Sequence, residues 1–312
     1  MHHLAAAWFE RSTSRWHDWP LESLLDAKGS IRISVVIPAR DEADTIGGIV
    51  AGIRHALMDE RPLVDELVVI DSDSTDDTAM VARDAGATVH SARAVRPDLG
   101  WFPGKGEALW KSQFVTSGDV LVFIDADLTG WGTHFVTGLL GPLLASPATA
   151  LVKGFYDRVL DDGSPRPQGG RVTELVARPL LNLRRPELAA VVQPLAGEWA
   201  VRRSMFETLS IPVGYGVELA VLLDTVASAG LDAIAQVDLG ERAHTHQSVH
   251  DLGVMAAEII AVADRRAGLP APRGHELWQF DRVAASPWRA RAVPLAERPP
   301  ASASRRHDAA AG

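Results

Sequence analysis

The sequence of 312 residues contains no cysteine. This absence excludes disulfide bonds, thiolate metal ligands and cysteine nucleophiles, so any bound metal must be held by oxygen or imidazole groups. Basic residues are also in the minority, with 31 Lys and Arg against 40 Asp and Glu and a formal net charge of -9. A chain with this balance does not suit a nucleic-acid surface, and its basic residues are better suited to small anionic ligands.

Long apolar runs are missing as well. No run approaches the roughly 18 to 20 residues that span a bilayer, and the N-terminus lacks the successive charged and apolar regions of a signal peptide. We therefore expect no membrane partner, no nucleic-acid partner and a cytoplasmic location, which the lack of cysteine also fits.

From Ile31 onward, short β-branched runs alternate with helical stretches. Helices are expected at about 45–58, 76–85 and 105–116, and the runs read as strands are Ile33–Ile37, Leu67–Ile70, Thr88–His90 and Val120–Ile124. Strands that alternate with crossover helices predict an α/β fold with a doubly wound, mostly parallel sheet.

The chain divides into four expected parts. Residues 1–30 carry aromatic residues and short helical patterns and are expected to cap the main domain. Residues 31–150 have the pattern of a nucleotide-binding half, and the less regular residues 151–265 form a smaller part expected to supply the acceptor side. Residues 266–312 form a C-terminal extension. From about Pro294 it is rich in Pro, Ala, Ser and Arg without apolar periodicity, which predicts a disordered tail.

The strongest chemical signal follows the apolar run Val120–Ile124. There Asp125-Ala126-Asp127 presents two carboxylates at the rim of the sheet, where they repel each other unless a cation lies between them. Mg²⁺ and Mn²⁺ prefer oxygen ligands and often bridge carboxylates to a diphosphate. The pattern therefore predicts a divalent metal site, with a helix-capping or salt-bridged aspartate pair as the alternative.

Polar residues also follow two other expected strands, at the edge where open parallel sheets bind ligands. Pro38-Ala39-Arg40-Asp41-Glu42 follows the first strand, and Asp71-Ser72 follows the second. A nucleotide base and ribose fit this position, whereas an ordinary strand-to-helix turn with capping aspartates is the alternative. Neither a dinucleotide-binding fingerprint nor a Lys-Ser/Thr phosphate loop occurs.

Two further segments place cationic side chains beside glycines at expected helix starts. Lys105 lies between Gly104 and Gly106, and Gly170-Arg171-Val172-Thr173 opens a later helix. A lysine at a helix start opposes the helix dipole unless an anion binds there, and backbone N–H groups beside a guanidinium suit a phosphorylated or carboxylated acceptor. A solvated loop lysine is the alternative for Lys105.

The last candidates lie near the end of the less regular part. Arg242-Ala243-His244-Thr245-His246 follows an expected strand near 234–239, and one imidazole is expected to complete the metal shell begun by the two aspartates. Tyr215 and Glu218 follow a flexible Gly-containing loop at the head of an apolar helix, where Glu218 either holds acceptor hydroxyls or caps the helix.

Taken in order, these motifs resemble the actinobacterial glucosyl-3-phosphoglycerate synthases from about residue 20 to 265. The resemblance implies a retaining GT-A type glycosyltransferase, dimeric, which uses Mg²⁺ or Mn²⁺ to move glucose from UDP-glucose to 3-phosphoglycerate for methylglucose lipopolysaccharide synthesis. One departure is His246, which stands where many relatives have asparagine.

The resemblance also implies a role for each matching residue. Lys105, Glu218 and Arg242 are expected to carry the chemistry, and Asp125, Asp127 and His244 to bind the metal. The expected donor contacts are Pro38, Ala39, Arg40, Glu42, Asp71, Ser72, Lys105, Asp125, Ala126 and Arg242. The expected acceptor contacts are Gly170, Arg171, Val172, Thr173, Tyr215, Glu218 and His246.

Alternative functions share parts of this pattern. Mannosyl transfer from GDP-mannose to the same acceptor would leave similar motifs, and a catalytically inactive nucleotide-sugar-binding protein would lose a metal ligand. A nucleotidyltransferase would show a Gly-rich loop with Arg and Lys after the first strand, and 37–42 lacks one. A polymerising inverting transferase commonly couples to membrane helices.

Overall fold

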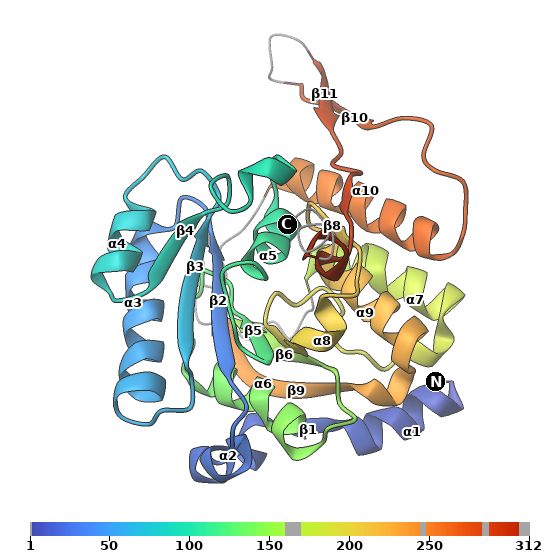
Figure 1. Cartoon of the computed structure of the whole chain (residues 1–312). Coiled ribbons are helices and arrows are strands. Elements are labelled where there is room, and N and C mark those ends of the chain that lie inside the picture. Colours follow the sequence, from blue (N-terminus) through green and yellow to red (C-terminus); the bar gives the residue numbers. More distant parts are fainter. Residues whose placement is uncertain (1, 160–169, 244–247, 283–286, 306–312) are drawn as a thin grey trace.

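The computed structural model describes residues 2–159, 170–243, 248–282 and 287–305. An eight-stranded sheet runs through this part of the chain in the order β1-β9-β6-β7-β5-β2-β3-β4 (Figure 1). Its strands are β1 (Thr13–Arg15), β2 (Ile33–Ala39), β3 (Glu66–Asp71), β4 (Thr88–Ser91), β5 (Val120–Phe123), β6 (Leu151–Val159), β7 (Trp199–Arg202) and β9 (Ile234–Ala243).

Most neighbouring strands of the sheet are parallel. The exceptions are the two pairs that β7 makes with β5 and β6, whereas β2 runs parallel to both β3 and β5, and β6 runs parallel to β9. The predicted mostly parallel sheet is therefore confirmed. The antiparallel β7 was not predicted from the sequence.

Helices cover both faces of the sheet because its strands bury apolar side chains in both directions. Along β2, Val35 and Ile37 join one core cluster and Val36 joins the other, as the two-residue period of a strand requires. One face carries α2 (Leu21–Lys28), α3 (Ala43–Arg54), α4 (Thr78–Asp84) and α6 (His134–Ala145). The other carries α1 (His3–Ser12), α5 (Lys105–Ser112), α7 (Arg178–Arg184), α8 (Arg203–Phe206), α9 (Val217–Ala229) and α10 (Val249–Arg266).

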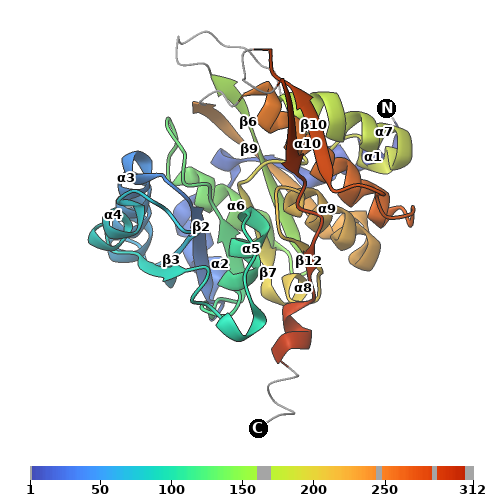
Figure 2. The ribbon, with the colours of Figure 1, turned by 90° about the horizontal axis from the view of Figure 1, so that it is seen from above.

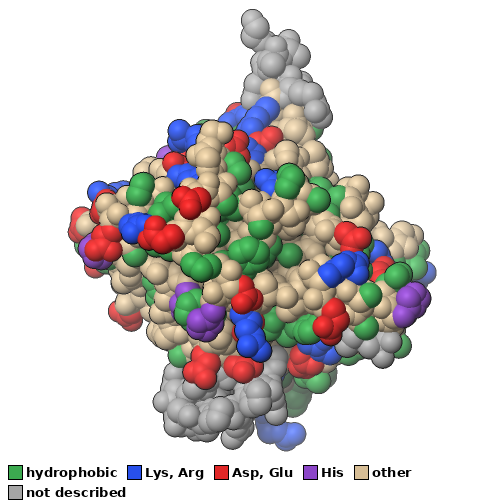
Figure 3. Space-filling model, turned by 90° about the horizontal axis from the view of Figure 1, so that it is seen from below, with side chains coloured by type: hydrophobic (Ala, Val, Ile, Leu, Met, Phe, Trp, Pro, Cys, Tyr) green, Lys and Arg blue, Asp and Glu red, His purple; other side chains and the backbone are tan. Residues whose placement is uncertain are grey.

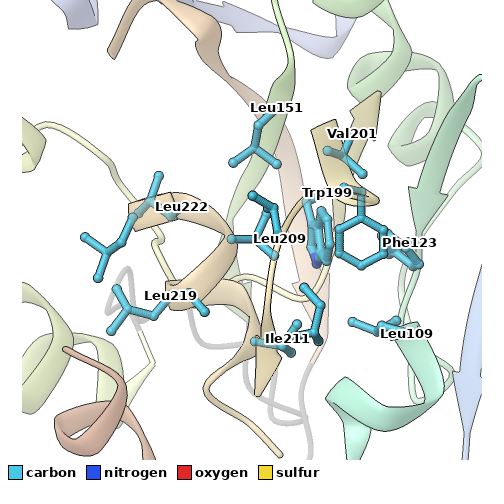
Figure 4. Packing of buried hydrophobic residues seen from close by; sticks show 14 of the residues in the cluster. Leu109, Phe123, Leu151, Trp199, Val201, Leu209, Ile211, Leu219 and Leu222 are labelled. Atoms are coloured by element: carbon cyan, nitrogen blue, oxygen red, sulfur yellow. The ribbon is translucent and has the colours of Figure 1, made fainter. Parts of the chain in front are cut away.

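The core beside β7 joins the two parts of the chain. Phe123 of β5 lies with its ring centroid 4.3 Å from that of Trp199 and 5.4 Å from that of Phe206. Figure 4 shows Leu219 and Leu222 of α9 in the same cluster as Leu109 of α5. Seen from above, the elements of 31–91 lie on one side of this core and those of the later chain on the other (Figure 2). Four short 3₁₀ helices also occur in the described residues: η1 (Trp16–Asp18), η3 (Pro97–Leu99), η5 (Pro186–Leu188) and η6 (Leu231–Ala233). Two π-helical segments adjoin longer helices: η2 (His55–Asp59) follows α3, and η4 (Thr173–Ala177) precedes α7.

The N-terminal segment does more than cap the domain. Besides α1 and α2 it contributes β1, which pairs in parallel with β9 at one edge of the sheet. Trp8 is fully buried and donates through its indole N–H to the carbonyl of Ile234, over 2.9 Å. The aromatic residues of 1–30 therefore anchor an edge strand, which composition alone did not indicate.

The C-terminal extension also departs from expectation. A hairpin of β10 (Glu276–Phe280) and β11 (Trp288–Ala292) projects from the body (Figure 1). The chain then returns, and β12 (Glu297–Arg298) pairs with β8 (Ile211–Pro212). Ala301 beyond it is fully buried. The predicted disorder from Pro294 is therefore wrong for residues 294–305, because long-range pairing holds a segment that has no periodicity of its own; residues 306–312 lie outside the described residues.

The surface is mixed in charge. On the face shown in Figure 3, acidic and basic side chains are interspersed, and the basic ones form no single patch among the residues described there. Among the helices that the structure describes, none is long and apolar enough to cross a membrane.

Candidate active site

One cavity of about 450 Å³ gathers most of the predicted residues at the carboxyl edge of the parallel strands. The ends of β2, β3, β5 and β9 reach it, and loops from the second part of the chain close it. Its lining includes Pro38, Ala39, Arg40, Glu42, Ser72, Lys105, Asp125, Ala126, Asp127, Gly170, Arg171, Val172, Thr173, Tyr215, Glu218 and Arg242.

Lys105 joins the two parts of the site. Its Nζ lies 2.5 Å from Oδ1 of Asp125 and 2.9 Å from Oε1 of Glu218. Burial acts to lower the pKa of Lys105, but these two carboxylates outweigh it and raise that pKa well above its ordinary value. Lys105 is therefore a fixed positive charge in the cavity rather than a solvated loop lysine.

Arg242 forms a second fixed cation at the end of β9. Its guanidinium donates to Oδ1 of Asp127 over 2.6 Å, to Oε1 of Glu198 over 3.0 Å and to the hydroxyl of Tyr156 over 2.8 Å. Burial opposes the charge, yet Glu198 and the neighbouring acidic groups raise the pKa of Arg242 well above its usual value. Arg242 thus lies between a fully buried carboxylate and the carboxylates at the end of β5.

The buried partners of these cations were missed from the sequence. Burial raises the pKa of Glu198, against the opposing effect of Arg242. Lys153 on β6 is buried too, and its ammonium donates to the carbonyl of Ala196 over 2.6 Å. Burial, with Lys105 nearby, lowers the pKa of Lys153 to about 8. The sequence signal that could have found these buried residues is a single charged residue within or beside an apolar run. Lys153 is such a residue in the run Leu151–Tyr156.

The carboxylates fit a divalent cation. Both Asp125 and Asp127 line the cavity and offer the oxygen ligands that Mg²⁺ and Mn²⁺ prefer. Burial, Asp127 and Asp125 raise the pKa of the adjacent Glu42 to about 7, a sign of concentrated negative charge that a dication would offset. Among the described residues no group of three potential ligands occurs. The predicted third ligand, His244, and the predicted acceptor contact His246 lie outside the described residues.

Asp125 also depends on a glycine of the second part. A Cβ at Gly197 would lie 2.1 Å from Oδ2 of Asp125, so only glycine lets the backbone before β7 pass this carboxylate.

Asp71 differs from its neighbour Ser72, because Ser72 lines the cavity while Asp71 does not. One oxygen of Asp71, Oδ1, is buried without a hydrogen-bond partner in the described structure.

The predicted acceptor residues line the same cavity from two helix starts. Arg171 lies just before η4 and Thr173 begins it, whereas Tyr215 lies in the loop before α9 and Glu218 in the first turn of α9. Oε2 of Glu258 on α10 accepts from the backbone N–H of Tyr215 over 2.6 Å and holds that loop. Burial is the main cause that raises the pKa of Glu258 to about 7.

Helix α10 was not assigned to the site from the sequence. Its apolar residues Leu252, Met255 and Ile259 line the cavity, as does Pro294 of the C-terminal segment. An apolar wall, fixed cations and paired carboxylates suit a ligand that carries both a ring and phosphate groups.

Comparison with known proteins bears on this site. The family described as Glycosyl transferase family 2 matches residues 34–209. The chain is 48% identical to a glucosyl-3-phosphoglycerate synthase of Mycobacterium tuberculosis over 272 residues, which cover 85% of this chain and 83% of that protein. It is 46% identical to a protein of the same name from Mycolicibacterium paratuberculosis, with 92% and 89% covered.

A solved structure has a similar fold over nearly the whole chain. The crystal structure of glucosyl-3-phosphoglycerate synthase from Mycobacterium tuberculosis, in complex with Mn²⁺, UDP-glucose and phosphoglyceric acid, matches with a TM-score of 0.85 and 44% identity. The match covers 94% of this chain and 99% of that one.

Proposed function

The chain belongs to glycosyl transferase family 2 and, within it, to the glucosyl-3-phosphoglycerate synthases, and we propose that it transfers glucose from UDP-glucose to 3-phosphoglycerate. The observation that carries this proposal is the meeting, in one cavity, of the aspartate pair at the end of β5, the two fixed cations Lys105 and Arg242, and the Arg171 loop. A donor diphosphate and an anionic acceptor each need such groups.

On the donor side, Asp125 and Asp127 would hold Mg²⁺ or Mn²⁺, with His244 as the third ligand. When bound, the dication would neutralise charge on the diphosphate. Lys105 and Arg242 supply positive charge that does not titrate near neutral pH and so stabilise the departing UDP. The remaining donor contacts, to base, ribose or sugar, are assigned to the cavity-lining residues Pro38, Ala39, Arg40, Glu42, Ser72 and Ala126. Asp71, which does not line the cavity, is proposed to reach the donor only from the end of β3 beside Ser72.

On the acceptor side, the phosphate and carboxylate of 3-phosphoglycerate are assigned to the Arg171 loop. The guanidinium and the hydroxyl of Thr173 donate to these oxygens, and the backbone of Gly170 and Val172 lies beside them. Tyr215, Glu218 and His246 are assigned to the rest of the acceptor.

The ion pair of Glu218 with Lys105 favours a retaining reaction. Oε1 of Glu218 is held 2.9 Å from the ammonium of Lys105, so this oxygen is engaged in an ion pair and is not placed as a separate base for the acceptor hydroxyl. The acceptor hydroxyl therefore attacks the anomeric carbon from the face that UDP leaves, and its proton passes to the departing phosphate oxygen as the sugar–phosphate bond breaks. Proton NMR of the product tests this step: an α-linked glucoside is expected, and a β-linkage would contradict it.

The reaction is tested by nucleoside-diphosphate release. UDP-glucose, GDP-glucose and GDP-mannose are offered with Mg²⁺ or Mn²⁺, each with and without 3-phosphoglycerate. Release that needs both UDP-glucose and the acceptor, and stops on chelation, is the expected result. Release from GDP-mannose instead would establish mannosyl transfer, and no release from any donor would indicate an inactive sugar-nucleotide-binding protein.

We also propose a homodimer, with the β10–β11 hairpin as part of the interface. Trp278, Phe280 and Trp288 on this hairpin are 59%, 46% and 55% exposed, although apolar side chains of this size gain most from burial. Sedimentation of the full chain should show a dimer, and Trp288→Ser should weaken it. A monomer at micromolar concentration would contradict the proposal. The cytoplasmic location and the role in methylglucose lipopolysaccharide synthesis stay predictions.

A further inference from the structure

The C-terminal segment returns from the hairpin to the back of the active-site loops. Glu297 pairs with Pro212 and Arg298 with Ile211, and the N–H of Val213 donates to the carbonyl of Ala296 over 3.1 Å. The chain from 211 leads directly to the Tyr215 loop and Glu218. The segment therefore contacts the site's supporting loops, although its composition predicted disorder.

Arg298 is the best-connected side chain of this segment. It is 7% exposed, and its guanidinium binds the carboxylate of Glu107 in a bidentate pair, with distances of 2.7 and 2.6 Å. It also donates to the carbonyls of Leu99, over 2.7 Å, and Gly100, over 3.1 Å. The same guanidinium lies 4.6 Å from the ring centroid of Phe102. One planar group thus bridges the end of η3 and the first turn of α5, a geometry that suits arginine and not lysine.

The first turn of α5, which Arg298 holds through Glu107, begins with Lys105. Gly104 has φ +133, and a Cβ there would lie 2.3 Å from the carbonyl oxygen of Val213. At Gly106 a Cβ would lie 1.8 Å from the carbonyl oxygen of Pro212. The N–H of Glu107 donates to the carbonyl of Val213 over 3.0 Å. Lys105 is therefore clamped between two close backbone crossings. The carbonyl of Gly100, ahead of it in the chain, accepts from both Lys111 and Arg298.

We propose that Arg298 is a positioning residue for Lys105, so that the C-terminal segment sets the geometry of donor binding. Arg298 does not line the cavity as described, so it acts through the loop and not on substrate. The inference rests on the proposed function, in which Lys105 binds the donor. A shift of about 1 Å in such a group can lower a rate 10²-fold, so the contact is measurable in kinetics.

The first test combines hydrogen exchange with kinetics in the full-length protein. In Arg298→Met, the amides of 99–107 should exchange faster. The KM for UDP-glucose should rise about 10–100-fold, while the KM for 3-phosphoglycerate changes less than about twofold. Arg298→Lys should fall between this variant and the wild type, because a single ammonium cannot make the bidentate pair.

Arg305→Met is the matched control. Arg305 lies on the same segment and pairs with Glu207 and the carbonyl of Gln113, away from the lysine loop. It should leave both the exchange of 99–107 and the KM for UDP-glucose unchanged. If Arg305→Met and Arg298→Met changed the exchange of 99–107 and the KM for UDP-glucose equally, the proposal would be overturned. Any loosening of the C-terminal segment would then produce the effect, and Arg298 would have no specific role.

A double variant separates positioning from folding. Arg298→Met alone leaves the buried carboxylate of Glu107 with only Lys111, whose Nζ lies 4.0 Å away, so the chain can lose stability for that reason. The double variant E107M/R298M removes both charges, and Lys111 keeps its bonds to the carbonyls of Val95, Arg96 and Gly100, so this variant should melt within about 5 °C of the wild type. Its KM for UDP-glucose should stay raised, because the carbonyl of Leu99 still lacks the donor that Arg298 supplied and the carbonyl of Gly100 keeps only the bond from Lys111. A double variant with the wild-type KM would overturn the proposal.

The two readouts also separate this inference from the proposed function. If no donor is turned over by the wild type, exchange alone decides whether Arg298 holds the loop. If exchange of 99–107 keeps its wild-type rate in Arg298→Met, the proposal fails even when UDP-glucose is a substrate. If exchange rises while the KM for UDP-glucose does not, the loop moves without consequence for the donor, and the proposal fails as well.

Discussion

Strand ends and loops border the same cavity but position their side chains in different ways. Asp125 and Asp127 follow the fully buried strand β5, so the sheet itself places them. Lys105 begins α5 and Tyr215 lies on the loop before α9, and each is supported by a charged group from a distant segment, Arg298 or Glu258. The difference teaches that the end of a buried strand already sets where its carboxylates lie, although both also pair with a cation. The start of α5 and the Tyr215 loop are supported by a buried charge that is far away in sequence.

Substitution of an aspartate at the end of β5 should lower the activity of the protein without lowering its stability. Asp127→Asn removes a proposed metal ligand, so kcat/KM for UDP-glucose should fall on the order of 10²–10³-fold. The side chain is 38% exposed in its pair with Arg242, so the free energy of unfolding should change by less than about 1 kcal/mol. Steady-state kinetics and thermal melting check both values.

Asp77→Asn is the matched control, because Asp77 is exposed just before α4. It should retain full activity. Wild-type activity in Asp127→Asn would contradict the assignment of Asp127 as a metal ligand. A large loss of stability in Asp127→Asn would contradict the contrast drawn above, because the strand end would then depend on this side chain's partner.

The Tyr215 loop should show a pH dependence set by Glu258. Burial raises the pKa of this carboxyl from 4.5 to about 7 in the folded protein. The folded state then binds the proton more tightly than the unfolded state, so the wild type loses stability as pH rises from about 4.5 to 7 and not above. Glu258→Gln has no such proton, so relative to the wild type it should gain about 2–3 kcal/mol between pH 5 and 8.

Thermal or urea unfolding of both proteins across this pH range measures the difference. The exposed Glu10→Gln should run parallel to the wild type. If Glu258→Gln also runs parallel to the wild type, then the folded protein does not hold the Glu258 proton, and the loop is not supported in the way described.

Arg242 combines the two kinds of support, because it lies near the end of β9 and also pairs with the buried Glu198. Glu198→Gln keeps an oxygen that can accept from Arg242 and Tyr156 but removes the charge. Loss of a charge-assisted hydrogen bond should lower the free energy of unfolding by about 1–3 kcal/mol, as measured by urea titration. Glu241→Gln, at an exposed position on the same strand, is the control. If Glu198→Gln and Glu241→Gln had the same free energy of unfolding, the charge of Glu198 would not be needed and β9 alone would hold Arg242.

Much of this protein could be predicted from the sequence. The short apolar, β-branched runs of β2, β3 and β5, with helical stretches between them, indicated the mostly parallel sheet, and polar residues after each strand indicated the binding edge. Asp125, Asp127, Lys105 and Arg242 could be found because motif order and strand ends are local properties of a chain.

Only the tertiary structure determined the supporting residues. Glu198, Glu258 and Arg298 are separated by 44, 43 and 191 positions from Arg242, Tyr215 and Glu107, the residues they hold. Nothing local marks them, since a charged residue beside an apolar run is as easily a solvated one. The strands β1 and β12 were missed for the same physical reason: each is stabilised by pairing with a distant strand, an energy that the segment's own sequence does not contain.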